Sequence, residues 1–201
     1  MARQSARLVL ATRNSHKVEE ISRLLAGSGV TVGSLSDHPA FPETVEDRDT
    51  LRGNAEKKAV EAARACGVWA LADDTGLEVD ALGGAPGVYS ARWAGAGCSY
   101  ADNCAKLERE LRGKTARGAA FKTVMALAAP DGTVETAEGR LDGSIATAPR
   151  GTGGFGYDPL FLLPDGRTLA ELSPDEKNAV SHRGRALRAI LPRLIALGET
   201  A

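Results

Sequence analysis

The sequence predicts an α/β fold, with a mixed central sheet flanked by helices and two lobes around a cleft. Short apolar runs typical of strands alternate along the chain with segments whose apolar residues recur at helical spacing. Because strands and helices mix throughout without a repeat or a linker, we expect one α/β domain that covers residues 1–201.

The first elements follow from an apolar run and the polar turn behind it. Leu8–Ala11 is predicted to be a strand that ends in the turn Thr12–Ser15, and the apolar residues of Val18–Leu25 then recur at helical spacing. Val30–Val32 is predicted to be a second strand. Ser34–Val45 contains two prolines, so we expect a loop there.

The middle of the chain begins with a long helix. Thr50–Cys66 is rich in alanine and mixed charges and has few breakers, which favours a helix. A buried strand is expected at Val68–Ala72, with the polar cluster Asp73–Thr75 at its end. Glycine and proline are dense in Gly83–Gly97, which indicates a shaped loop, and Tyr100–Leu111 should be a helix with Leu107 and Leu111 facing inward.

The last third of the chain begins with a predicted β-hairpin. Ala119–Ala129 and Val134–Leu141 read as its strands, because Asp131-Gly132 between them supplies a tight turn. The remaining predicted elements are a glycine-rich loop at Gly151–Asp158, a strand at Leu160–Leu163 and a helix over Ser181–Leu197 that is interrupted at Pro192.

Composition excludes several classes of function. The 25 Lys and Arg residues against 26 Asp and Glu give a net charge of −1, so no global field draws the chain to nucleic acid or to an anionic membrane. No apolar run is long enough for a membrane span or a signal peptide. The three cysteines form no Cys-x-x-Cys pair, which argues against a disulfide framework or a zinc site, so we expect a cytoplasmic protein.

The polar turn at Thr12–Lys17 has two interpretations. Ser, Thr and Asn residues commonly cap helices, and a cap alone would explain them. The second interpretation is an anion site, because the N–H groups and dipole of a helix N-terminus favour phosphate and Lys17 adds a full positive charge.

The paired carboxylates Asp73 and Asp74 follow a predicted buried strand. Two adjacent carboxylates there are costly unless they are paired, solvated or bound to a metal, although a simple turn capped by Asp is the alternative. Magnesium takes one or two carboxylates together with substrate phosphates and water. Asp74 could bind it with one of the upstream acidic residues Glu43, Glu46, Asp47 or Asp49.

A third set of residues carries an aromatic ring and several donors. Phe155 lies in the glycine-rich loop, and Lys177, His182 and Arg183 follow it. Each has an ordinary explanation, since a histidine at a helix start is usually a solvated cap and an adjacent arginine a surface charge. Together they supply the stacking surface and the donors that a purine pocket would use.

Several segments, taken together, resemble the inosine/xanthosine triphosphate pyrophosphatase family. They are Leu10–Lys17, Asn54-Ala55 with Lys58, Ala72–Asp80, Leu82–Arg92, Gly153–Pro159 and Ser181–Arg183. The resemblance implies a homodimeric, magnesium-dependent enzyme, a nucleoside-triphosphate diphosphatase. It would hydrolyse the deaminated purine nucleotides ITP, dITP and XTP to the monophosphate and pyrophosphate, with the nucleotide bound in the cleft between the lobes.

The resemblance also implies roles for residues of the first half of the chain. Asp74 resembles the family's general base, which also lies by the metal. Glu46 aligns with the family's acidic metal ligand when Thr50, Asn54 and Lys58 are held in register, although the family usually has Glu-Thr-Gly where this chain has Glu46-Asp47-Arg48. The residues that resemble the triphosphate-binding turn are Thr12, Arg13, Asn14, Ser15, His16 and Lys17.

The implied contacts to substrate continue in the second half. Thr75 looks like a substrate contact at a position where many relatives carry serine, a change that keeps the hydroxyl. The residues that resemble the nucleobase and phosphate contacts are Phe155, Gly156, Tyr157, Asp158, Lys177, His182 and Arg183. The 6-carbonyl of hypoxanthine or xanthine could accept hydrogen bonds from Arg183 or His182, whereas adenine presents an amino group there.

The chemistry of the reaction agrees with this assignment. Attack of water at the α-phosphorus needs a base for the water and cations for the charge that builds up on pyrophosphate. Asp74 would be the base, and magnesium with Lys17 and Lys58 would supply the cations. Two other functions remain open: a related pyrophosphatase for pyrimidine or modified nucleotides, and a nucleotide sensor without catalysis.

Overall fold

The computed structural model describes residues 8–35, 41–42 and 44–199. Their contacts divide the chain into two compact units. The first unit is built from residues 1–74, 123–139 and 183–201, and the second from residues 75–122 and 140–182. Helices and strands mix in both units, which confirms the predicted α/β class. The cleft between the lobes and the single domain stay predictions.

The first unit holds the parallel part of the sheet. Strands β1 (Leu8–Leu10) and β2 (Val32–Ser34) are parallel, and β1 is also parallel to β3 (Trp69–Val79), with Leu10 beside Leu71. The order continues from β3 to β5 (Gly118–Ala128) and β6 (Val134–Ile145). Each of the strands β3, β5 and β6 has residues in both units.

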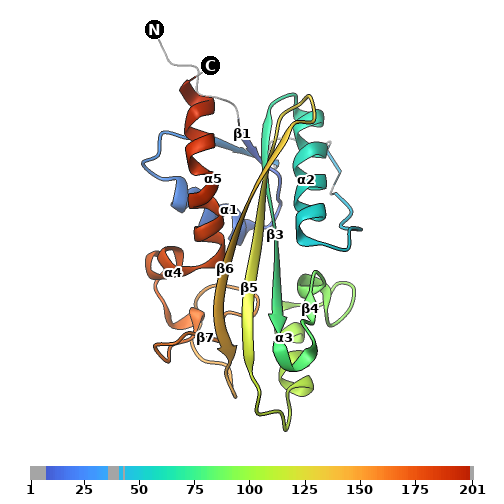
Figure 1. The fold of residues 1–201 in the computed structure, drawn as a ribbon, viewed down its shortest axis with the longest axis vertical. Helices are drawn as coiled ribbons and strands as arrows, with labels where there is room; N and C mark the ends of the chain where they lie inside the picture. The colour runs from blue at the N-terminus through green and yellow to red at the C-terminus, as the bar shows by residue number, and fades with distance from the viewer. Residues whose placement is uncertain (1–7, 36–40, 43, 200–201) are drawn as a thin grey trace. The chain divides into compact units, whose positions relative to one another are not determined.

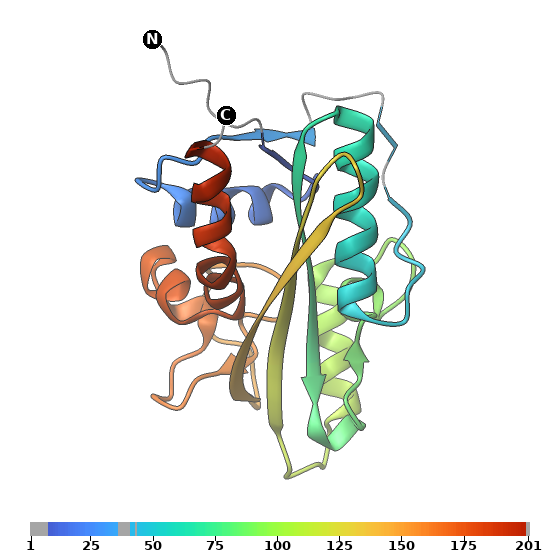
Figure 2. The same cartoon turned by 45° about the horizontal axis from the view of Figure 1, so that its top comes forward.

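Helices cover both faces of the sheet in the first unit. They are α1 (Ser15–Leu25), α2 (Leu51–Cys66) and α5 (His182–Glu199). Figures 1 and 2 show α2 on one side of the strands and α1 and α5 on the other. Because successive strand residues point to opposite faces, two separate apolar clusters form. Leu8, Leu10 and Leu71 pack with α1 and α5, whereas Val9, Ala70 and Ala72 pack with α2.

The second unit contains shorter elements around its own apolar core. Strand β4 (Pro86–Gly87) pairs antiparallel with β3, and β7 (Phe161–Leu162) pairs antiparallel with β6. Helices α3 (Tyr100–Glu110) and α4 (Pro174–Val180) belong to this unit. Single 3₁₀ turns lie at Asp80–Leu82, Ser90–Arg92 and Leu169–Glu171. Leu77, Leu107 and Phe161 are fully buried in its core.

Several elements confirm the sequence predictions at their caps and turns. Thr50 is the N-cap of α2, where its side chain accepts a hydrogen bond from Gly53 N, and Gly67 ends the helix in the left-handed conformation. The predicted hairpin joins β5 to β6, with Gly132 at φ +95° in its turn and the Asp131 carboxylate accepting from Thr133 N at 2.8 Å.

Four predictions about elements were wrong. β2 begins at Val32 rather than Val30, and β3 runs on through Asp73–Thr75 to Val79 instead of ending before them. α4 was not predicted, although Ser173 and Glu176 form a capping box and Pro174 is the first residue of the helix. α5 continues through Pro192, because Ile190, Leu194 and Leu197 keep its apolar face packed on the sheet.

The described residues include no helix that is both long enough and apolar enough to cross a membrane.

Candidate functional site

Strand β3 directs Asp73 and Asp74 to opposite faces of the sheet. The alternation that places Leu71 against α1 and α5 and Ala72 against α2 continues by two residues, so Asp73 follows Leu71 and Asp74 follows Ala72. Both aspartates are buried, with 2% and 5% of their surface exposed. Each carboxylate therefore has its own surroundings, although the residues are neighbours in sequence.

Asp73 is held by two cations from the helices on its face. Lys17 Nζ of α1 lies 3.1 Å from Asp73 Oδ2, and the Arg183 guanidinium of α5 donates to the same oxygen from Nε at 3.2 Å and from NH2 at 3.0 Å. Arg183 NH1 donates to Glu20 Oε2 of α1 at 2.6 Å. Asp73 and Arg183 thus tie α1 and α5 to the sheet at one point.

In this cluster, burial and the opposite charges together set the pKa values of Asp73 and Lys17. Burial works against charged Asp73, but Lys17 and Arg183 outweigh it and hold the pKa of the Asp73 carboxyl well below its usual range. Burial lowers the pKa of Lys17, while the Asp73 carboxylate opposes that shift. Two acidic and two basic side chains therefore form a compact neutral network within the first unit.

Asp74 lies on the α2 face within a different set of partners. Lys58 Nζ donates to Asp74 Oδ1 at 3.0 Å and to Glu46 Oε1 at 2.8 Å, and Asn54 Nδ2 donates to Asp74 Oδ2 at 3.3 Å. Asn54 also accepts from the backbone N–H of Arg48 at 3.0 Å, which fixes the segment that carries Glu46. The structure therefore brings Lys58 and Asn54 against Asp74 and Glu46 against Lys58, while the role of Glu46 as a metal ligand stays a prediction.

The second cluster carries an excess of negative charge. Burial raises the pKa of Asp74, the Glu46 carboxylate raises it further, and Lys58 works against both. Burial disfavours the charged form of Lys58, but Asp74 and Glu46 more than compensate and its pKa is raised. With Lys58 protonated, two carboxylates share one ammonium group, so the cluster can accept a further cation.

The turn at Thr12–Lys17 is a capped helix start. Asn14 is the N-cap of α1, and its Oδ1 accepts from His16 N at 3.1 Å and from Lys17 N at 3.3 Å. Thr12 Oγ1 accepts from Asn14 N at 3.2 Å. Ser15 and His16 are exposed, and Arg13 NH2 donates to the Phe41 carbonyl at 2.7 Å. The capping interpretation holds for Asn14, and phosphate binding by this turn stays a prediction.

The second unit brings together part of the predicted purine pocket. Lys177 Nζ of α4 lies 2.6 Å from Asp158 Oδ2 and 4.9 Å from the centroid of the Phe155 ring. Asp158 Oδ2 also accepts from the backbone N–H of Phe155 at 2.8 Å. Gly154 has φ +68°, and a Cβ there would overlap the Asp158 carboxylate, so only glycine fits. Lys177 and Asp158 thus fix both the ring and the loop.

Other predicted contacts lie deeper in the second unit. His182 is 3% exposed and stacks on Phe121, with ring centroids 4.6 Å apart. Tyr157 packs in the apolar core, and its hydroxyl donates to the Ser90 carbonyl at 2.9 Å. Gly156 precedes it with φ +65°, and Thr75 is partly buried in β3. Their expected contacts to substrate stay predictions.

Two of the acidic residues considered as alternative metal ligands, Asp47 and Asp49, have surroundings of their own. Asp47 Oδ1 accepts from Lys57 Nζ at 2.9 Å, and Asp49 is exposed. Glu43 lies outside the described residues. Among the residues that the structure describes, no group of three or more His, Cys, Asp and Glu side chains could hold a metal ion. Any metal here would depend on the Glu46 and Asp74 pair.

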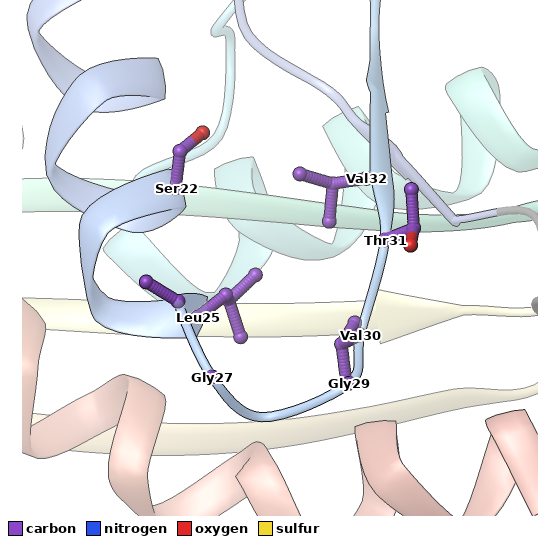
Figure 3. Close-up of a pocket in the computed structure, with 8 residues that line it drawn as sticks. Ser22, Leu25, Gly27, Gly29, Val30, Thr31 and Val32 are labelled. Atoms are coloured by element: carbon purple, nitrogen blue, oxygen red, sulfur yellow. The ribbon is translucent and has the colours of Figure 1, made fainter.

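A pocket of about 510 Å³ lies apart from these clusters, at the end of α1 and the start of β2. Figure 3 shows its lining, which includes Ser22, Leu25, Val30 and Val32. The lining contains no acid, base or cysteine and none of the predicted site residues. The polar side chains of this pocket are therefore the hydroxyls of Ser22 and Thr31 alone among its lining residues.

Sequence reasoning missed three members of the site. Glu20 was not singled out, although it lies one helical turn after Lys17 on α1 and so shares its face. Asn54 was part of the family resemblance and set the register of Glu46 but was given no role in the site, yet it binds Asp74 directly. Asp73 was grouped with Asp74, whereas strand alternation could have separated their roles.

The sequence is similar to those of known proteins. The sequence pattern of the Ham1 family matches residues 8–193. A dITP/XTP pyrophosphatase of Geobacter sulfurreducens is 53% identical over 191 residues, which cover 94% of this chain and 96% of that protein. A dITP/XTP pyrophosphatase of Syntrophobacter fumaroxidans is 54% identical over 185 residues, covering 92% of this chain and 80% of that protein.

Solved structures show the same similarity. A HAM1 protein from Coxiella burnetii superimposes with a TM-score of 0.87 at 39% identity, covering 95% of this chain and 99% of that one. A nucleoside-triphosphatase, or dITP/XTP pyrophosphatase, from Mycobacterium abscessus has a TM-score of 0.74 at 47% identity, covering 94% and 99% of the two chains.

Proposed function

The chain belongs to the Ham1 family, and from that premise we propose that it hydrolyses the deaminated purine nucleotides ITP, dITP and XTP to the monophosphate and pyrophosphate. The observation that carries this proposal is the position of Asp74, a buried carboxylate with raised pKa that is fixed by Lys58 and Asn54. Relatives with about half of their residues identical are named for this activity.

Asp74 acts as the general base in this proposal. A base for water must be held in place and must be basic enough to accept a proton near neutral pH. Lys58 and Asn54 each bond one oxygen of Asp74 and so fix its plane, while burial raises its pKa toward the working range. The carboxylate orients the water and takes its proton as the oxygen attacks the α-phosphorus.

Glu46 and Asp74 suit a magnesium ion. Magnesium prefers oxygen ligands and is usually held by one or two carboxylates plus phosphates and water. The two carboxylates lie 2.8 and 3.0 Å from one ammonium group, and the cluster keeps a net negative charge. When bound, the ion would neutralise charge on the phosphates, and Glu46 and Asp74 would hold it.

Lys17 and Lys177 carry the remaining charges toward the substrate. Lys17 lies at the start of α1, where its ammonium group can neutralise charge that develops on the leaving pyrophosphate. Lys177 lies over the Phe155 ring and presents donors to a base stacked on that ring. We assign triphosphate chemistry to the first unit and nucleobase recognition to the second.

The family resemblance also supports a homodimer, and the cysteines support a location in the cytoplasm. Cys66, Cys98 and Cys104 are free thiols, which a reducing compartment would preserve. The dimer rests on the resemblance alone.

Product analysis in oxygen-labelled water tests the proposed reaction. With ITP and magnesium, attack at the α-phosphorus places the label in the monophosphate and releases unlabelled pyrophosphate. Label in pyrophosphate, or release of orthophosphate, would refute the mechanism. A panel with dITP, XTP and pyrimidine triphosphates distinguishes a pyrophosphatase for deaminated purine nucleotides from one for pyrimidine nucleotides. Binding of ITP without any turnover would favour a nucleotide sensor without catalysis instead.

A further inference from the structure

Helix α3 contacts the loop that carries Phe155 at two successive residues. The Tyr100 and Phe155 rings have centroids 5.7 Å apart and planes inclined by 43°. Cys104 Sγ lies 3.3 Å from the carbonyl oxygen of Gly156. Because residues four apart lie on the same face of a helix, one face of α3 meets both loop residues.

The contact from Cys104 is a directed hydrogen bond. Burial raises the pKa of the Cys104 thiol to about 11, with the Glu108 and Asp158 carboxylates adding to the shift. The thiol therefore stays protonated at neutral pH and donates its proton to the Gly156 carbonyl. This bond fixes the loop backbone next to Phe155, while the Tyr100 ring meets the Phe155 side chain.

The helix is anchored independently of Tyr100. Ser99 and Asp102 form a capping box at its start, with Ser99 N donating to Asp102 Oδ2 at 2.8 Å. Leu107 and Leu111, further along the same face, are buried in the core of the second unit. Tyr100 itself is 38% exposed, so its ring adds little to the core. Its ring contacts the ring of Phe155.

We propose that Tyr100 is a positioning residue for nucleobase binding, which holds the Phe155 ring, together with Cys104 at Gly156, in the orientation on which a purine base stacks. The inference rests on the proposed function. Tyr100 acts through Phe155, because its ring contacts the Phe155 ring. Lys177 and Tyr100 thus restrain one ring from two helices, α4 and α3.

Steady-state kinetics with ITP test this role. Tyr100→Ala should raise KM about threefold to tenfold, the range that one aromatic pair supplies, while kcat stays the same. Tyr100→Phe keeps the ring and should behave as the wild type. Arg109→Ala, an exposed change on the same helix, serves as the control for nonspecific effects on α3.

A double-mutant cycle separates positioning from general support of the fold. In a Phe155→Ala background, Tyr100→Ala should cause no further rise in KM, because the ring that it orients is gone. An unchanged KM in Tyr100→Ala, or fully additive effects in the double variant, would overturn the inference. A wild type that does not hydrolyse ITP would instead refute the proposed function on which the inference depends.

Discussion

At the scale of single residues, the neighbouring aspartates Asp73 and Asp74 have different roles. Strand geometry sends Asp73 to the cations of α1 and α5 and Asp74 to Lys58 and Asn54 of α2. The pKa of Asp73 is lowered and that of Asp74 is raised, so the folded protein favours charge on the first and disfavours it on the second. Asp73 therefore supports stability, and Asp74 is available for chemistry.

Replacing Asp74 tests the general base. Asp74→Asn keeps the shape and one of the two acceptor oxygens but cannot take a proton, so turnover of ITP should fall about 10²-fold or more. Because burial disfavours the charge on Asp74, the free energy of unfolding, measured in urea without magnesium, should change little in this variant. Wild-type turnover in this variant would place the base elsewhere, with Asp73 or Glu46 as the next candidates.

Replacing Asp73 should show the opposite pattern in stability. Asp73→Asn leaves Lys17 and Arg183 without their shared carboxylate, and losing one partner of a buried ion pair costs about 3 to 5 kcal/mol. The free energy of unfolding, measured in urea without magnesium, should therefore drop far more than in Asp74→Asn. Equal stability of the two variants would contradict the division of roles between the aspartates.

At the scale of elements, caps and alternation explain which predictions succeeded. Thr50 caps the start of α2 and Gly67 its end, as local chemistry predicts, and Asp131-Gly132 forms the turn of the hairpin. The polar residues of β3 were misread as a strand end, because only tertiary structure supplies the cations that allow buried aspartates inside a strand. α5 likewise passes Pro192 because long-range packing outweighs one lost hydrogen bond.

The start of α4, which carries Lys177, gives a prediction about pH. The pKa of Glu176 is lowered to about 2, first by the backbone N–H of Ser173 and then by Arg167. A lowered folded-state pKa contributes stability above the ordinary value of 4.5, and that stability is lost as pH falls toward 2. Glu176→Gln should be less stable than the wild type in urea at pH 6, and the gap should narrow as the pH falls below 4.5 and close only toward pH 2. A gap that is independent of pH would contradict this role of the capping carboxylate.

At the scale of the whole molecule, the family was predicted from the order of several motifs along the chain rather than from any single motif. The segments that resemble the family run through the chain, and the family match covers residues 8–193. Local patterns did not reveal that Arg183 binds Asp73 or that His182 stacks on Phe121, because these partners are distant in sequence. Such contacts follow from topology, which residue spacing does not encode.

The association of whole chains is a separate prediction. The family resemblance implies a homodimer, so sedimentation equilibrium at micromolar concentration should give about twice the mass of one chain, which is 20.9 kDa. A single species at the mass of one chain would contradict the proposed dimer, and it would leave the chemistry assigned to Asp74 unaffected.

The selectivity of the whole enzyme between ITP and ATP tests the central claim most directly. Hypoxanthine presents a 6-carbonyl to the donors predicted for the purine pocket, Arg183 or His182, whereas adenine would set an amino group against them, and such mismatches reach about 100-fold or more in kcat/KM. Pyrophosphate release with magnesium should therefore show kcat/KM for ITP at least ~100-fold above that for ATP. Equal values for the two nucleotides would contradict the proposal that this chain acts on deaminated purine triphosphates.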